Sequence, residues 1–279
     1  MMNGSDSRAP RSLSFVVCIA FAAVLFAACG SGSNEGVAEN TLSLAPTIAA
    51  RSTLTSGGVE VQTIGQSVQG RQIEALTIGR GRRTAVVIGG IHTGMESETV
   101  DLVTDLLWEL IAHPRSLPAG SRLIFIPNAN PDGYANDSRT NANDVDLNRN
   151  FPAGDWTEFA MHGELDVYGG EAALSEPEAE ALYNFLAELE PDFVLSFHGY
   201  AGVIQHNNAP GAESLGVAFG EAAGYETLDE WPFYEVTGEL IEALGDLGIP
   251  AADVELLEAD EMSFDRALEG LKAVLDELG

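Results

Sequence analysis

The nine residues TAVVIGGIH, positions 84 to 92, decide the fold. The first five form a short, continuous apolar run, which is typical of a strand buried inside a sheet. Gly89 and Gly90 end the run, and His92 follows almost at once. In α/β proteins the reactive groups gather at the carboxyl ends of the strands. The stretch therefore predicts an interior strand that delivers a histidine to the functional edge of a sheet.

Apolar and amphipathic segments alternate along the rest of the chain. Strands are predicted over residues 59–62, 73–78, 122–127, 193–197 and 252–256, and helices over 97–112, 175–190, 212–223, 237–247 and 264–278. Ser175 is expected to cap the second of these helices. The long polar stretch between residues 128 and 174 is expected to be a functional loop, with NPDG as a turn. This pattern predicts a single-domain, three-layer α/β sandwich with a mixed, largely parallel central sheet flanked by helices.

The charge of the chain excludes one large class of partner. Its 279 residues include 43 acidic and 13 basic side chains, giving a formal net charge of -30. A surface this acidic repels the phosphate backbone, so we expect no nucleic-acid binding. The acidic residues are expected to solvate the surface of a monomer.

The N-terminal residues predict export. Arg8 and Arg11 precede an apolar run over residues 13–28, which has the length of a signal peptide's hydrophobic region. Small residues before Cys29 resemble a bacterial lipobox, so residues 1–28 are interpreted as a lipoprotein signal peptide and Cys29 as the lipidated residue. Residues 29–58 are expected to form a flexible tether, and residues 59–279 the catalytic domain. The predicted location is the bacterial cell envelope, lipid-anchored outside the cytoplasm; ordinary secretion and an uncleaved anchor are the alternatives.

Two of the five histidines follow predicted buried strands. His92 and His198 come directly after such strands, with Glu96 and Glu98 close behind the first. Two imidazoles and a carboxylate can bind zinc and leave a fourth position for water. Read from the spacing alone, these residues could equally be loop residues with ordinary hydrogen bonds. Of the other histidines, His162 and His206 are expected in loops.

Six motifs occur along the chain in the following order: GGIH (89–92) with a following Glu, NPDGY (130–134), DLNRNFP (146–152), SEPE (175–178), SFHGY (196–200) and GIPAADVEL (248–256). Together they resemble the zinc metallocarboxypeptidase family, similar to carboxypeptidase A and especially to its short bacterial members. The resemblance covers roughly residues 59–279. DLNRNFP with its flanking motifs is quite specific, whereas NPDG or a lone histidine is not.

The resemblance implies one zinc ion per chain and a role for each matching residue. The implied zinc ligands are His92, Glu96 and His198. The implied substrate-carboxylate clamp is Asn148 and Arg149, and the implied general base is Glu255. Arg139 matches the arginine that polarises the scissile carbonyl, and Asp146 matches the carboxylate that orients the first zinc histidine.

The sequence departs from the family pattern in two places. The spacing from His92 to the carboxylate is one residue longer than in most members, and we expect a turn at Gly94 to accommodate Glu96 as the ligand. Glu98 is then expected to be a first-turn acid of the following helix. The position that matches the family's mobile tyrosine is Gly245, so that role is either absent or filled from elsewhere, for example by Tyr234.

The sequence therefore predicts a zinc-dependent carboxypeptidase that hydrolyses the C-terminal amide bond of peptides bearing a free carboxylate. Cell-wall peptides are one candidate class of substrate. The alternatives are a small-amide deacylase of the desuccinylase and aspartoacylase type, and a non-catalytic, lipid-anchored protein that binds carboxylates. The presence of Glu255 argues against the binding-protein alternative, because binding a carboxylate requires no general base.

Overall fold

The structure is a computed structural model that describes residues 58–257 and 263–279, together with the backbone alone for residues 261 and 262. The predicted signal peptide, Cys29 and nearly all of the predicted tether lie outside these residues. Within the described ranges, no helix is both long enough and apolar enough to cross a membrane.

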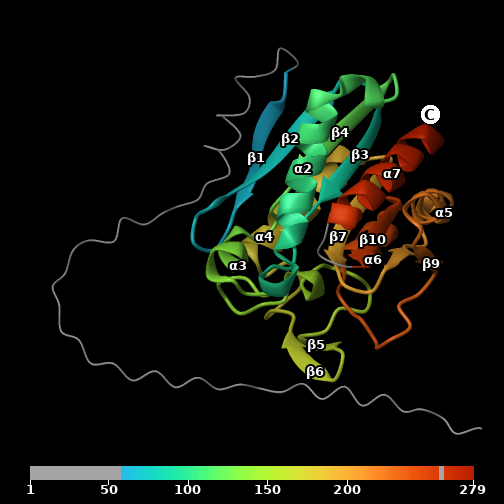
Figure 1. Cartoon of the computed structure of the whole chain (residues 1–279). Helices are drawn as coiled ribbons and strands as arrows, with labels where there is room; N and C mark the ends of the chain where they lie inside the picture. The colour runs from blue at the N-terminus through green and yellow to red at the C-terminus, as the bar shows by residue number, and fades with distance from the viewer. Residues whose placement is uncertain (1–57, 258–260) are drawn as a thin grey trace, which may run out of the picture. The chain divides into compact units, whose positions relative to one another are not determined.

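The central sheet has eight strands within the described residues, in the order β1-β2-β4-β3-β7-β10-β8-β9 (Figure 1). They span Glu60–Gln66 (β1), Gln72–Gly79 (β2), Arg83–Ile88 (β3), Ser121–Ile126 (β4), Phe193–Gly199 (β7), Val203–His206 (β8), Glu226–Leu228 (β9) and Ala251–Leu256 (β10). The central strands β4, β3, β7 and β10 run parallel. Strands β2 and β8 pair antiparallel with the two outer members of this group, β1 pairs antiparallel with β2, and β9 pairs parallel with β8. The predicted mixed sheet with a parallel centre is confirmed.

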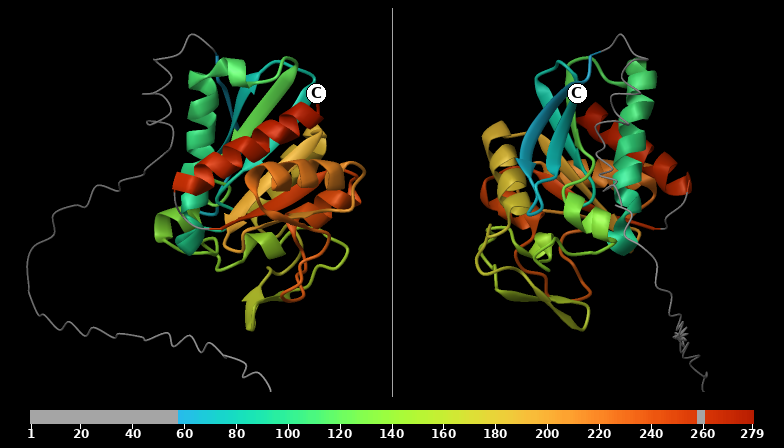
Figure 2. Two further views of the ribbon diagram at one scale, coloured as in Figure 1. Left: turned by 45° about the vertical axis from the view of Figure 1, so that its right-hand side comes forward. Right: turned by 90° about the vertical axis from the view of Figure 1, so that its left-hand side faces the viewer.

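Helices cover both faces of this sheet. Helices α2 (Glu98–Ala112), α5 (Ala212–Ala223) and α7 (Glu261–Glu277) pack on one face, and α4 (Pro177–Leu189) and α6 (Leu240–Asp246) pack on the other. The right-hand view of Figure 2 shows the sheet lying between α2 and α4. The three-layer sandwich expected from the sequence is therefore the observed architecture.

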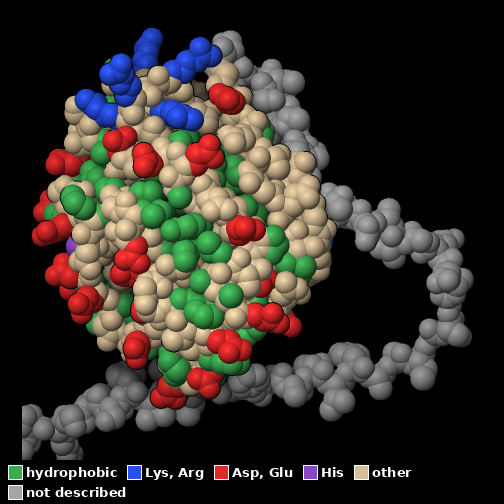
Figure 3. Space-filling view, turned by 180° about the vertical axis from the view of Figure 1, so that it is seen from behind, with side chains coloured by type: hydrophobic (Ala, Val, Ile, Leu, Met, Phe, Trp, Pro, Cys, Tyr) green, Lys and Arg blue, Asp and Glu red, His purple; other side chains and the backbone are tan. Residues whose placement is uncertain are grey.

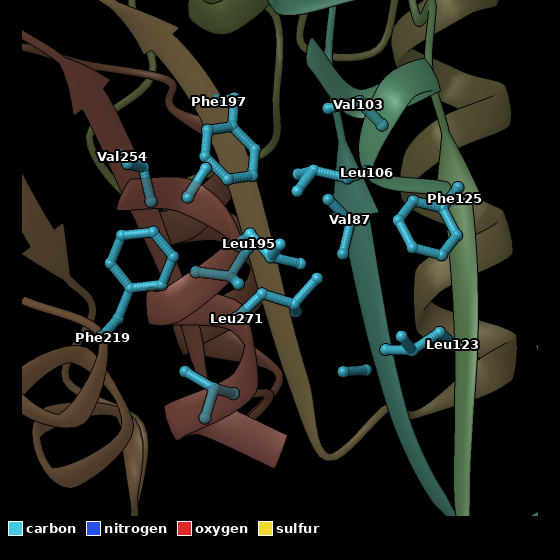
Figure 4. Packing of buried hydrophobic residues seen from close by; sticks show 14 of the residues in the cluster. Val87, Val103, Leu106, Leu123, Phe125, Leu195, Phe197, Phe219, Val254 and Leu271 are labelled. Atoms are coloured by element: carbon cyan, nitrogen blue, oxygen red, sulfur yellow. The ribbon is translucent and has the colours of Figure 1, made fainter. Parts of the chain in front are cut away.

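The apolar runs explain why the layers hold together. Val87, Leu195 and Val254 point from three neighbouring strands toward the helices of one face, where Leu106 and Leu271 meet them (Figure 4). Their neighbours in the chain point to the opposite face, because side chains alternate along a strand. Each fully buried side chain of this kind stabilises the fold by about 1.5–3 kcal/mol. A strand in this position needs apolar residues at every position, which is the pattern of residues 84–88.

The segment between β4 and α4 contains more regular structure than the sequence predicts. Pro131–Asn136 forms helix α3, and Leu147–Arg149 forms the 3-10 helix η3. Phe159–His162 (β5) and Leu165–Tyr168 (β6) pair as a two-stranded antiparallel sheet. The prediction of NPDG as a simple turn is wrong, because Asn130 accepts a hydrogen bond from the Gly133 N–H and so caps a helix that begins at Pro131.

Two further expectations need correction. Ser175 does not cap α4: the N-cap is Glu176, and the Ser175 hydroxyl donates to the Glu176 carboxylate over 2.9 Å. His162 and His206 were expected in loops, but His162 is the last residue of β5 and His206 is the buried last residue of β8. Strands β8 and β9 were missed because their apolar runs are short and one of them, β9, lies at the edge of the sheet.

The surface reflects the acidic composition. Asp and Glu side chains are spread over the face drawn in Figure 3, whereas Lys and Arg gather at one end of it.

Candidate active site

Parallel strands place the predicted site residues at one edge of the sheet. Strands β3, β7 and β10 are neighbours, so their carboxyl ends meet. His92 follows β3, whereas His198 and Glu255 lie near the ends of β7 and β10, directly opposite each other in register. The topology thus brings together three side chains that are far apart in the sequence.

The glycines after β3 are required by close packing against α2. A Cβ on Gly89 would lie 2.5 Å from the Thr99 carbonyl oxygen, and Gly90 has a positive φ of +65°. The Gly90 N–H donates to the Thr99 hydroxyl over 3.0 Å, and that hydroxyl donates to the Glu96 carbonyl over 2.8 Å. This turn fixes the path of the chain on both sides of His92.

The extra residue after His92 is taken up by a 3-10 turn, η1 (Gly94–Glu96), just before α2. Gly94 has a φ of +69°, a left-handed conformation that favours glycine. The turn directs the Glu96 side chain inward and leaves Met95 exposed. Glu98 points elsewhere, because its carboxylate accepts a hydrogen bond from the Tyr200 hydroxyl.

His92, Glu96 and His198 form a compact and buried triangle of potential metal ligands. The two histidine Nδ1 atoms lie 3.2 Å apart. The Glu96 Oε2 atom lies 3.4 Å from Nδ1 of His92 and 3.6 Å from Nδ1 of His198. Within the described residues, this is the group of three that could hold a metal ion.

The triangle fits a tetrahedral zinc ion. Zinc bonds of about 2.0–2.2 Å place neighbouring ligand atoms about 3.3–3.6 Å apart. The observed edges of 3.2, 3.4 and 3.6 Å are close to these separations. The donor set of two imidazoles and one carboxylate is also one that zinc prefers, and it leaves the fourth position open.

Neighbouring groups orient the two imidazoles. Nε2 of His92 lies 2.8 Å from Asp146, and Nε2 of His198 lies 2.8 Å from the Ser196 hydroxyl. These contacts occupy the Nε2 atoms and leave both Nδ1 atoms facing Glu96. Asp146 is fully buried and also accepts the Asn148 backbone N–H over 3.1 Å. Asp146 thus lies in hydrogen-bond contact with the first of the two histidines.

Positive charge around the triangle lowers the pKa of Glu96 and of Asp146. Burial by itself would raise the pKa of Glu96, but His92, His198 and Arg139 hold it well below its usual range. The Arg139 guanidinium contacts Glu96 through Nη1 and lies 3.1 Å from Asp146 through Nε. Arg139 therefore lies at the edge of the triangle, and it also lines the adjacent cavity.

Asn148 and Arg149 line the same cavity. Arg149 is almost fully buried, and its Nη1 donates to the Asn148 carbonyl over 2.7 Å while Nη2 lies 3.3 Å from the Met161 carbonyl. The Asn148 side-chain oxygen accepts the Leu240 N–H over 3.0 Å. Backbone contacts from three segments thus hold both side chains in place.

Glu255 faces the same cavity from β10. Burial raises the pKa of its carboxyl group to about 7, and the charge of Glu96 acts in the same direction. A carboxyl group with a pKa near the working pH can both accept and return a proton.

The cavity has a volume of about 680 Å³, within the range of small-molecule sites. Besides the predicted residues, it is lined by side chains that sequence reasoning did not assign: His162, Gln205, Trp231, Phe233, Glu239 and Asp253. Tyr234 also lines it, with its hydroxyl 3.2 Å from Nδ1 of His162. The sequence could have predicted Asp253 as a cavity residue, because it lies two positions before Glu255 and side chains alternate along a strand. No local sequence pattern predicts that Glu239 lines the cavity.

Several known proteins resemble this chain in sequence. Murein peptide amidase A of Escherichia coli K12 is 32% identical over 161 residues, which cover 52% of this chain and 63% of that protein. The match therefore spans less than two thirds of that relative. Gamma-D-glutamyl-L-diamino acid endopeptidase 1 of Lysinibacillus sphaericus is 28% identical over 209 residues, covering 59% of this chain and 52% of that protein.

A solved structure shares the fold. The crystal structure of murein-tripeptide amidase MpaA from Escherichia coli O157 superposes with a TM-score of 0.64 at 24% identity, covering 80% of this chain and 93% of that one. The model of the zinc carboxypeptidase family (Peptidase_M14) matches residues 47–214, which is more than half of the sequence. The chain belongs to the zinc carboxypeptidase family.

Proposed function

We propose that this protein is a zinc-dependent metallocarboxypeptidase that hydrolyses the amide bond before the C-terminal residue of a peptide. One observation carries the proposal: the triangle of His92, Glu96 and His198 shares a single cavity with Glu255 and with Arg149. These groups can respectively hold a metal ion, move a proton and bind a carboxylate. A protein that only bound carboxylates would need no such base.

The triangle would hold the zinc ion through Nδ1 of each histidine and the carboxylate of Glu96. When bound, zinc supplies Lewis acidity, which lowers the pKa of water and polarises a carbonyl oxygen. The protein contributes the orientation of the ligands, because Asp146 and Ser196 fix the two imidazole rings.

Glu255 would act as the proton carrier. Its carboxylate accepts a proton from the attacking water, and the resulting carboxylic acid returns that proton to the leaving amine. Arg139 would meet the negative charge that develops on the carbonyl oxygen, since its guanidinium lies beside the triangle and reaches the cavity.

Arg149 and Asn148 would hold the substrate's terminal carboxylate. The guanidinium is anchored by backbone carbonyl groups and lines the cavity, so it is preorganised for an anion. This contact places the last amide bond near the triangle and converts binding into orientation. Tyr234 lines the same cavity, and we propose that it takes the position of the family's mobile tyrosine.

We propose cell-wall peptides as the substrate class. Two relatives carry names that refer to murein peptides and to a γ-D-glutamyl-L-diamino acid bond. The predicted lipid anchor at Cys29 would keep the protein at the cell envelope, where such peptides occur.

The carboxylate clamp can be tested with paired peptides. We expect the protein to release the last residue of a peptide with a free C-terminus and to hydrolyse the C-terminally amidated peptide at least about 100-fold more slowly, because Arg149 loses its charged partner. Product analysis by mass spectrometry measures both rates.

A panel of N-acyl amino acids distinguishes the proposed carboxypeptidase from a small-amide deacylase. Faster turnover of these small amides than of any peptide would replace the proposed function. Tight binding of the free-carboxylate peptide by zinc-loaded protein, without cleavage, would favour the binding-protein alternative.

A further inference from the structure

Positive charge gathers at one end of the molecule. Half of the lysine and arginine residues in the described ranges lie there, and Figure 3 shows their side chains together at one end of a face that is otherwise dotted with acids. In a chain with 43 acidic and 13 basic side chains, such a concentration creates a local positive field. The members of this arginine cluster are Arg80, Arg82, Arg83, Arg115 and Arg122.

The strand register brings part of the cluster together. Arg83 begins β3 and lies opposite Ser121, the residue that begins β4. Arg122 follows in β4 and lies opposite Gly79, the last residue of β2. The amino ends of two parallel strands and the end of β2 therefore meet at one edge of the sheet.

The other three arginines come from connections that reach the same edge, and all three are exposed. Arg80 and Arg82 flank Gly81 in the β2–β3 turn, where the Gly81 N–H donates to the Ser121 carbonyl over 3.1 Å. Arg115 lies between the end of α2 and the start of β4. Two connections and two strands thus contribute cations to a single surface.

The cluster is not neutralised from within the protein. No carboxylate among the described residues forms an ion pair with any of its five guanidinium groups, whereas Arg139 contacts Asp146 at the active site. Arg83 has the end of α7 beside it, at Gly279. The three exposed arginines give the cluster its accessible charge, which is available to a partner from outside the protein.

The chain enters the domain at this same end. Glu60 begins β1 and lies opposite Thr77, which is three residues before Arg80. Figure 1 shows β1 beginning at the top of the molecule, where α2 ends. The predicted tether over residues 29–58 stops just before β1, so the predicted lipid anchor at Cys29 would hold the domain from the side of the arginine cluster.

The active-site cavity lies toward the opposite end of the sheet. Arg83 begins β3, and the turn that follows this six-residue strand carries His92. At about 3.3 Å per residue, the strand separates the two ends by roughly 20 Å. A surface that contacted the arginine cluster would leave the cavity facing away from it.

We propose that the arginine cluster docks the folded domain on an anionic lipid surface, the membrane that would hold the anchor, and so directs the active-site cavity away from the bilayer. Basic residues close to a membrane are attracted to anionic headgroups, with roughly a fivefold gain in binding for each residue. At physiological ionic strength this attraction extends about 8 Å, so the headgroups sense the cluster and not the acids at the far end. The acids would be repelled in any other orientation.

The predicted tether makes a weak attraction sufficient. A random coil of about 30 residues has a root-mean-square length of roughly 30 Å, which keeps the domain near the bilayer at a high effective concentration. Such a tether limits the distance of the domain from the membrane without fixing its orientation. The separation of charge between the two ends of the domain supplies the orientation.

The test measures binding of the full chain to two kinds of vesicle, phosphatidylcholine alone and phosphatidylcholine mixed with phosphatidylglycerol. The triple variant Arg80→Gln/Arg82→Gln/Arg115→Gln should bind the anionic vesicles about 10- to 100-fold more weakly than the wild type and the neutral vesicles equally well. Both proteins share the same N-terminal residues, so the affinity of that segment for lipid cancels in the comparison. At about 1 M salt, where screening limits the attraction to about 3 Å, the difference should disappear.

The matched control is Arg80→Lys/Arg82→Lys/Arg115→Lys, which changes the same three positions and keeps their charge. It should bind the anionic vesicles within about threefold of the wild type, because attraction to a charged surface depends on charge and not on the guanidinium geometry. Thermal unfolding and peptide hydrolysis in solution should be the same in both variants as in the wild type, since the cluster lies away from the cavity.

Three results would overturn the docking surface. The first is equal binding of the glutamine variant and the wild type to anionic vesicles. The second is a lysine variant that binds as weakly as the glutamine variant, which would indicate a specific phosphate site. The third is arginine-dependent binding of soluble poly(glycerol phosphate) without arginine-dependent binding of vesicles, which would identify an anionic polymer as the partner. None of these results depends on peptide hydrolysis, so the proposed function stands or fails separately.

Discussion

Glu255→Gln is expected to lower kcat/KM for peptide hydrolysis by about 10²- to 10⁴-fold, the usual contribution of a general acid–base group. Glutamine has nearly the same shape as glutamate but cannot accept the proton of the attacking water. Glu255 is not part of the metal triangle, so the variant should still bind one zinc ion per chain. Steady-state kinetics and elemental analysis of the same preparation measure both properties.

The Glu242→Gln variant serves as the control for this prediction, because Glu242 lies outside the cavity lining. It should retain wild-type kinetics. If Glu255→Gln kept wild-type turnover with zinc bound, another group would have to carry the proton, and the proposed mechanism would be wrong.

Glu96→Ala is expected to weaken zinc binding by more than about 100-fold, beyond the usual cost of losing a group that only supports a ligand. The reason is geometric, since Glu96 Oε2 completes the triangle with the two histidine Nδ1 atoms. Glu98→Ala should keep its zinc, because Glu98 contacts the Tyr200 hydroxyl instead. Competition with a chromophoric chelator measures the zinc affinity of each variant.

This pair of variants also tests how the additional residue after His92 is accommodated. If Glu98→Ala lost zinc and Glu96→Ala bound it normally, Glu98 and not Glu96 would be the carboxylate ligand of the zinc ion. Loss of peptide hydrolysis should accompany loss of zinc in whichever variant shows it.

The sequence predicts the parts of this fold that are determined by local pattern. The continuous apolar runs at residues 84–88 and 122–127 identify interior strands, because a strand covered on both faces has no place for polar side chains. The strand over residues 84–88 and the predicted strand over residues 193–197 then explain why His92 and His198 meet, since parallel neighbours end at the same edge of a sheet. The position of Glu96 follows from a turn at Gly94, whose positive φ the structure provides.

The elements and site residues that the sequence does not predict depend on contacts between distant segments. Helix α3 and the β5–β6 pair lie in a polar stretch without hydrophobic periodicity, and long-range hydrogen bonds fix their surroundings. One example is Asn150, whose amide donates to the Gly169 carbonyl over 2.6 Å. Glu239 has the local sequence of an ordinary helix start, and only its distance from Arg149 places it at the cavity. Tyr234 likewise enters the site through tertiary structure, because the alignment position of the mobile tyrosine is Gly245.

Removal and return of zinc tests the central claim most directly. Protein treated with a chelator, dialysed and shown by elemental analysis to be metal-free should no longer release the last residue of a free-carboxylate peptide. One equivalent of zinc per chain should restore the release, and magnesium should not, because imidazole ligands suit zinc and oxygen ligands suit magnesium. Undiminished hydrolysis by the metal-free protein would contradict the account.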